Sequence, residues 1–389
     1  MPLKFLVVAV FLTSISLGCS QYPVSGYIDM ADSDKYPMIY MIDPLIFSAL
    51  ASSFEGKVID SARIDQKGKF IFKKMPIVDK SKIYLLTIQK PDEKYPNRLE
   101  NDQPEWSNYI PFIYRTSEHI NIKSSADKLL KDAVIIGDIK ENDIILQLIK
   151  TRFELYGNIL SQQKELNETN LIDHEKALNN YQHKLMESVK DISDVYINAL
   201  ALRWISSSGD YERVPELVSQ ACMKLKQSSP GDPWAAQICK ISASLPLIPG
   251  NHFPDFPMPM IKGDTVKLYT ILGEKLTLID LWASWCAPCR HENKHTLVPL
   301  WDEFHQKGFQ IIGYALDSSE KGWRNAIEKD GADRWLHASH LQGDVSPLFE
   351  QLRITTIPAN YLIDEDGIIV AKNLHGEEMY QRVREYFKE

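Results

Sequence analysis

Residues 279–290 read IDLWASWCAPCR, and the apolar segment 276–282 leads into them. Such a segment predicts a buried β-strand, and Pro288 suits the first turn of a helix that follows it. Cys286 then stands at the helix N-terminus, where unpaired backbone N–H groups and the helix dipole favour a thiolate. Cys289 lies one turn further along the same helix face. We therefore expect an exposed, attacking Cys286 and a less exposed, resolving Cys289, close enough to form a disulfide.

Strand-like and helix-like segments alternate after this point, which predicts an α/β domain whose sheet is covered on both faces. The predicted helices are 287–306, 320–329, 344–352 and 377–387. The predicted strands that follow the first are 309–316, 359–364 and 368–372, the last two joined by a turn at 364–367.

The stretch around the two cysteines resembles the active site of the thioredoxin family. The resemblance gives Asp280 the place of the family's buried acid, which takes or relays the proton of the resolving cysteine, and burial is expected to raise its pKa. Residues 356–358, Thr-Ile-Pro, resemble the family's cis-proline loop, in which Pro358 faces the disulfide and Ile357 presents its backbone to an extended substrate. The resemblance assigns three residues to the substrate-binding surface: Trp285, Pro288 and Ile357.

Further matches resemble the TlpA/ResA branch of secreted, often membrane-tethered thioredoxins, over residues 250–389. They are Arg290, Glu292, Leu316-Asp317, Trp323 and Leu362-Ile363-Asp364 followed by Gly367. The chain departs from the family at two positions. Lys294 stands where the family has a helix-kinking proline, so we expect a straighter helix, and Ala359 follows Pro358 where threonine is usual.

Three other functions compete with redox chemistry. A zinc site could be built from Cys286, Cys289, His291 and His295, but His291 lies about 200° around the helix from Cys289 and should point away. A peroxiredoxin-type peroxidase would have Pro and Thr seven and three residues before its cysteine, where this chain has Ile279 and Ala283. A binding protein with a vestigial thioredoxin fold would not need the intact cysteine pair, Asp280 and Pro358.

The direction of the reaction follows from the dipeptide between the cysteines. Ala287-Pro288 and Ile357 resemble the reductases of the family rather than its strong oxidants, which tend to have His beside the first thiolate. We expect a reductase of disulfides in client proteins, recharged by a membrane thiol–disulfide electron donor. No cofactor and no metal ion are expected besides the cysteine pair itself.

The N-terminus predicts export from the cytoplasm. Lys4 precedes the apolar run 5–12, which is too short to span a bilayer and suits a signal peptide at 1–18. Cys19 after Gly18 resembles a bacterial lipobox, in which the cysteine is acylated, whereas Ser16 also suits ordinary cleavage at the same bond. We expect the periplasm or cell envelope, with a lipid anchor at Cys19 as the only attachment to a membrane; plain secretion is the alternative.

Two further domains are expected between the signal peptide and residue 250. Residues 22–124 hold short β-branched and aromatic segments separated by turns, which predict an all-β sandwich or barrel. Residues 60–62 and 68–72 resemble the N-terminal domain of unknown function found in Bacteroidetes-type secreted thioredoxin proteins. Residues 126–248 change to a helical period, which predicts an α-helical domain.

Cys222 and Cys239 lie at equal distances from the breaker run SSPGDP, residues 228–233. If the helices on either side run antiparallel, the two cysteines lie at equal depth and could form a structural disulfide. Two buried free thiols are the alternative.

Composition excludes other classes of protein. The 389 residues carry 44 Lys and Arg against 52 Asp and Glu, and 44% of them are hydrophobic. The hydrophobic fraction argues against a disordered chain, and the net charge of -8 argues against nucleic-acid binding, which needs clustered basic residues.

Overall fold

A computed structural model describes most of the chain, in the ranges 23–30, 37–89, 93–163, 170–245, 247–354 and 356–388. The predicted signal peptide and Cys19 lie outside the described residues. Within those ranges, no helix combines the length and the apolar composition needed to span a membrane.

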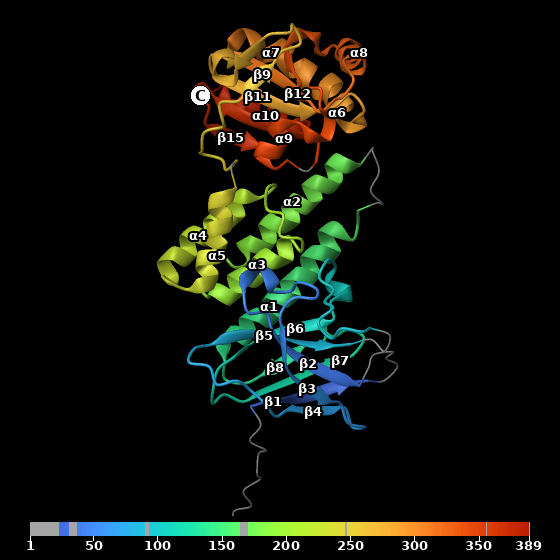
Figure 1. The fold of residues 1–389 in the computed structure, drawn as a ribbon, viewed down its shortest axis with the longest axis vertical. Coiled ribbons are helices and arrows are strands. Elements are labelled where there is room, and N and C mark those ends of the chain that lie inside the picture. The colour runs from blue at the N-terminus through green and yellow to red at the C-terminus, as the bar shows by residue number, and fades with distance from the viewer. Residues whose placement is uncertain are drawn as a thin grey trace, which may run out of the picture.

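The N-terminal part consists of two four-stranded sheets, which lie at one end of the molecule (Figure 1). One sheet has the order β4-β1-β7-β8, with β1 parallel to β7, and the other has the order β3-β2-β5-β6. The strands are β1 (Val24–Asp29), β2 (Met38–Asp43), β3 (Lys57–Arg63), β4 (Lys69–Phe72), β5 (Lys82–Ile88), β6 (Tyr109–Tyr114), β7 (Ile120–Ser125) and β8 (Val134–Ile136).

Five α-helices follow and occupy the middle of the molecule (Figure 1). They are α1 (Lys140–Leu155), α2 (Leu171–Glu187), α3 (Val195–Ile205), α4 (Pro215–Ser228) and α5 (Pro233–Ser244). The Asp194 and Asp232 carboxylates accept hydrogen bonds from the first backbone N–H groups of α3 and α5, which fixes where these helices begin. Buried side chains from Val24 to Leu245 form one continuous cluster, so the strands and these helices share a core.

Helices α4 and α5 carry the two cysteines outside the C-x-x-C pair. Cys222 and Cys239 are joined in a disulfide with a Cα–Cα distance of 4.8 Å, and they are 17 residues apart in the sequence. The disulfide therefore links the two helices on either side of the 229–232 turn.

The C-terminal part has its own core and a five-stranded sheet of order β13-β12-β11-β14-β15. Its strands are β11 (Leu276–Trp282), β12 (Phe309–Ala315), β13 (Leu336–Ala338), β14 (Ala359–Asp364) and β15 (Ile369–Lys372), preceded by the short pair β9 (Pro257–Pro259) and β10 (Thr265–Lys267). Its helices are α6 (Ala287–Glu292), α7 (Val298–Phe304), α8 (Glu320–Asp330), α9 (Pro347–Leu352) and α10 (Glu377–Tyr386). The predicted fold class, a thioredoxin-like α/β domain after an all-β part and a helical part, is confirmed.

The helix after the cysteines differs from the prediction. The predicted helix is present but is not a regular α-helix, because a five-residue π turn, Asn293–Leu297, separates α6 from α7. Pro299 in the first turn of α7 has no N–H to donate to the preceding turn, and a widened turn is a common way for a helix to accommodate this. Pro299, rather than Lys294, is the residue that bears on the shape of this helix.

We predict that replacing both Cys222 and Cys239 by alanine lowers the free energy of unfolding by about 3 kcal/mol, because the disulfide restricts the unfolded chain. The loss is measured by urea unfolding of the whole protein, monitored by tryptophan fluorescence, in the transition of the part that contains α4 and α5. Replacing Cys286 and Cys289 is the control, since that pair closes a much shorter loop. An unchanged unfolding transition in the double variant would indicate that Cys222 and Cys239 do not restrict the chain.

Candidate active site

The site is built on β11, the middle strand of the C-terminal sheet. All seven residues of Leu276–Trp282 are buried, as is typical of a strand covered on both faces. Asp280 lies in this strand opposite Gly313 of β12 and Asn360 of β14, and it is 3% exposed. Burial raises the pKa of Asp280 well above its usual range, and the nearby Glu292 charge raises it further.

The strand leads directly into the cysteine pair at the start of α6. Cys286 is the N-cap residue of this helix, and its Sγ accepts a hydrogen bond from the backbone N–H of Cys289 at 3.2 Å. Pro288 lies in the first turn, where no intrahelical partner is lost. Cys286 and Cys289 are joined in a disulfide with a Cα–Cα distance of 5.3 Å.

The expectation of an exposed Cys286 is wrong for this disulfide form. Cys286 is 5% exposed and Cys289 2%, whereas the neighbouring Trp285 is 62% exposed. Both sulfurs belong to the cluster of buried side chains that also contains Ile357. The packing of residues distant in sequence covers the first sulfur, which a one-dimensional pattern does not show.

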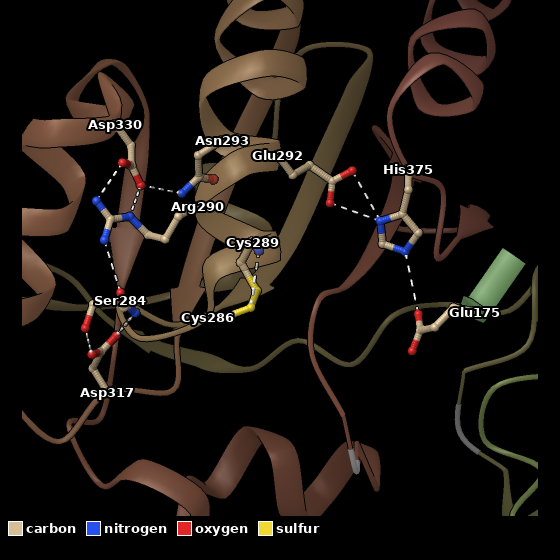
Figure 2. Close-up of a disulfide and its surroundings, with 10 residues drawn as sticks. All are labelled: Glu175, Ser284, Cys286, Cys289, Arg290, Glu292, Asn293, Asp317, Asp330 and His375. Atoms are coloured by element: carbon tan, nitrogen blue, oxygen red, sulfur yellow. Dashed lines mark hydrogen bonds and ion pairs between the residues drawn. A yellow bond between two sulfur atoms is a disulfide. The ribbon is translucent and has the colours of Figure 1, made fainter. Parts of the chain in front are cut away.

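Ion pairs fix the loop before the cysteines (Figure 2). The Arg290 guanidinium binds both oxygens of Asp330, which is buried, and donates to the Ser284 carbonyl at 3.1 Å. The Ser284 N–H donates to Asp317 at 2.9 Å. Lys294, at the position where the family has proline, also pairs with Asp330, at 3.1 Å. These contacts hold the chain on both sides of the cysteines against α8 and the end of β12.

The Ile357–Pro358 peptide bond is cis. Pro358 precedes β14, which is paired with β11, so the loop and the cysteine pair are attached to neighbouring strands. Ile357 is 9% exposed. The residues assigned to the substrate surface therefore differ in accessibility: Trp285 is open to a partner and Ile357 is largely covered.

A second buried acid lies one helical turn after Cys289. The Glu292 carboxylate is 3% exposed and accepts a hydrogen bond from the backbone N–H of Gly376 at 3.1 Å. Its other neighbour is His375, whose Nδ1 lies 3.0 Å from Oε2. Figure 2 shows Cys289, Glu292 and His375 following one another, with Glu175 of α2 on the far side of the histidine.

The four residues considered for zinc binding do not form a metal site. The His291 and His295 rings lie beside each other with centroids 4.3 Å apart, but both cysteine sulfurs are taken up by their disulfide. Among the described residues, no three or more His, Cys, Asp or Glu side chains are grouped so that they could hold a metal ion.

The Glu292–His375 contact was not predicted from the sequence. The spacing of three residues from Cys289 was a usable signal, because it places Glu292 on the same helix face as the resolving cysteine. His375 gave no signal, since it lies 83 residues further along the chain in a loop.

Comparisons with known proteins agree on the C-terminal part. Residues 249–372 match the AhpC/TSA family. The thiol-disulfide oxidoreductase ResA of Bacillus thuringiensis is 24% identical over 139 residues, which are 36% of this chain and 76% of that protein. The thiol:disulfide interchange protein DsbE of Pseudomonas fluorescens is 27% identical over 128 residues, which are 31% of this chain and 63% of that protein.

Among solved structures, the thioredoxin domain of a thiol-disulfide oxidoreductase from Bacteroides vulgatus is 33% identical, covering 36% of this chain and 99% of that one, with a TM-score of 0.34. The C-terminal domain of the chain is a TlpA/ResA-like thiol–disulfide oxidoreductase domain of the thioredoxin family.

Proposed function

We propose that this protein is an extracytoplasmic reductase of client protein disulfides that cycles between the Cys286/Cys289 dithiol and disulfide. The observation that carries the proposal is the Cys286 sulfur at the N-cap of α6, hydrogen-bonded to the Cys289 N–H. A thiolate in this position receives a backbone hydrogen bond and the favourable end of the helix dipole.

The cycle begins with the reduced protein. The Cys286 thiolate attacks one sulfur of a client disulfide, forms a mixed disulfide, and displaces the other client sulfur, which takes up a proton. The Cys289 thiol then loses its proton, attacks the Cys286 sulfur and displaces the second client thiolate. Two electrons have passed from the dithiol to the client. A membrane thiol–disulfide electron donor must then return two electrons to the Cys286–Cys289 disulfide.

Asp280 is the base proposed for the resolving step. Its carboxyl is buried on the strand that leads into the cysteine loop, and its raised pKa makes it a stronger base than a solvated aspartate. It also has no direct access to the client in this buried position. We assign it the proton of Cys289, because the Cys286 thiolate is already stabilised by the Cys289 N–H and the start of α6.

The substrate surface and the location of the protein are part of the same proposal. Trp285 offers an exposed aromatic ring next to Cys286, and Pro288 and Ile357 are proposed to border the client chain. The short apolar run after Lys4 and the lipobox-like Cys19 support export and lipid attachment. The Ala287-Pro288 dipeptide supports the reductive direction.

We predict that Cys289→Ala accumulates mixed disulfides with clients, because Cys286 can still attack whereas no second thiol resolves the adduct. Non-reducing electrophoresis of the protein after incubation with a disulfide-containing protein measures the adducts. Cys286→Ala is the matched control and should form none. A reactive Cys286 that forms no adduct in Cys289→Ala would favour a binding protein with a vestigial thioredoxin fold.

We predict that Asp280→Asn slows the resolving step by about 10²–10⁴-fold and the initial attack by only a few-fold, since loss of a positioned base has this size of effect. Stopped-flow kinetics with a disulfide substrate separates the two steps. Equal rates for both steps in wild type and variant would contradict the proposed role.

The same variant has an expected effect on stability. Because the folded-state pKa of Asp280 is raised, the folded protein keeps a proton that the unfolded chain loses, and stability falls as the pH rises above about 4. Asp280→Asn has no carboxyl group to ionise, so its free energy of unfolding should rise relative to that of wild type between pH 4 and pH 8. Denaturant titrations across this range test whether the carboxyl is as buried in solution as in the structure.

A further inference from the structure

The position of Glu292 depends on a single loop between β15 and α10. His375 places Nδ1 at 3.0 Å and 3.2 Å from the two carboxylate oxygens, and the Gly376 N–H donates to one of them at 3.1 Å. Both side chains are almost fully buried, at 3% and 1% exposed for Glu292 and His375. A buried carboxylate needs these partners, so a movement of the loop would move or expose the charge near Asp280.

Helix α2, from the other part of the molecule, holds this loop. Lys176 Nζ donates to the His375 carbonyl at 2.9 Å. At the start of the loop, Lys372 Nζ donates to the carbonyl of Glu212 at 2.6 Å. These bonds join segments 199 and 160 residues apart in the sequence, and they fix the backbone that carries the histidine.

The second ring nitrogen of His375 faces Glu175 of α2. The distance from Nε2 to Glu175 Oε2 is 4.0 Å, and within the described residues this buried nitrogen has no hydrogen-bond partner. Glu175 is held in turn by Arg213, at 2.7 Å. A carboxylate therefore faces each nitrogen of the ring, Glu292 at Nδ1 and Glu175 at Nε2 (Figure 2).

The same contacts border a cavity of about 680 Å³ between α2 and the loop. Thr356, which directly precedes Ile357-Pro358, lines it as well. The space between the helical part and the C-terminal domain thus extends from Glu175 and His375 to the cis-proline loop.

We propose that Glu175 is a positioning residue of the redox site, acting through His375 on Glu292. A carboxylate faces each nitrogen of the ring, so Nδ1 contacts Glu292 on one side and Glu175 bounds the ring on the other. The inference rests on the proposed function, since it concerns the step in which Cys289 gives up its proton to Asp280. It makes the helical part a contributor to the chemistry and not only a spacer.

Charged groups face the histidine from both parts of the molecule. Glu292 of α6 and Glu175 of α2 are acidic, and the basic Arg213 and Lys176 lie on the helical side. Replacing Glu175 removes the group that faces Nε2, so the ring is held less firmly and the Nδ1 contact that compensates the Glu292 charge weakens. Ionisation of Asp280 then becomes harder, because the uncompensated charge of Glu292 raises its pKa further.

The test is the pH dependence of the resolving step in the full-length protein, measured by stopped flow with a disulfide substrate. Glu175→Gln should move the midpoint of this profile upward by about half a unit, which is roughly a threefold loss of rate at a fixed pH below it. The rate of the initial attack should stay as in wild type. Glu187→Gln is the matched control, because Glu187 is exposed on the same helix and pairs with Lys190.

A second variant tests the route through the histidine. His375→Gln should move the midpoint in the same direction, and the double variant Glu175→Gln/His375→Gln should move it no further than His375→Gln alone. Independent, additive shifts would overturn the proposed relay. A midpoint that is unchanged or lower in Glu175→Gln, in a variant with the wild-type melting temperature, would overturn it as well.

Different results would contradict the role of Glu175 and the proposed reductase cycle. If wild type shows the resolving step and Glu175→Gln reproduces its profile, only the role of Glu175 is wrong. If wild type forms no mixed disulfide or never resolves it, the proposed reductase cycle fails and the inference fails with it.

Discussion

The hydrogen bond from the Cys289 N–H to the Cys286 sulfur is the contact around which the site is arranged. It exists because β11 ends at Trp282 and α6 begins at Ala287, so that Cys286 falls on the cap position between them. A cap residue one place earlier or later would leave the sulfur outside the reach of the free N–H groups. The buried strand, the proline in the first turn and the ion pairs of Arg290 all serve to keep this junction in place.

The two buried acids, Glu292 and Asp280, lie in different surroundings. Glu292 receives a backbone N–H and faces the His375 ring, so its charge has partners inside the protein. Asp280 is buried in the central strand, where its raised pKa shows that the neutral form is favoured. The raised pKa of Asp280 suits the proton acceptor that we propose, whereas Glu292 is held by the loop between β15 and α10.

The sequence predicted the parts of the site that lie within single segments. The C-x-x-C pair could be read from its spacing at the start of a helix, whereas Asp280 and the X-Pro loop were recognised from the resemblance to the thioredoxin family. The buried state of Cys286 could not be predicted, because it depends on packing against side chains far along the chain. The π turn could have been predicted from Pro299, whereas the prediction for this helix used only Lys294. His375 could not be predicted from spacing, since it lies in a loop, where no periodicity indicates which residues are in contact.

The helical part contacts the loop of the C-terminal domain that holds Glu292. The loop after β15 is short and carries the only histidine that contacts Glu292 among the described residues. Within the C-terminal domain, that loop is anchored by Asn360, whose amide donates to the Leu374 carbonyl at 2.7 Å and whose oxygen accepts from the Leu374 N–H at 3.0 Å. These bonds fix the backbone but leave the outer side of the histidine ring unsupported. Helix α2 places Glu175 on that side, so the surroundings of the Glu292–His375 pair include a residue that lies outside the thioredoxin fold.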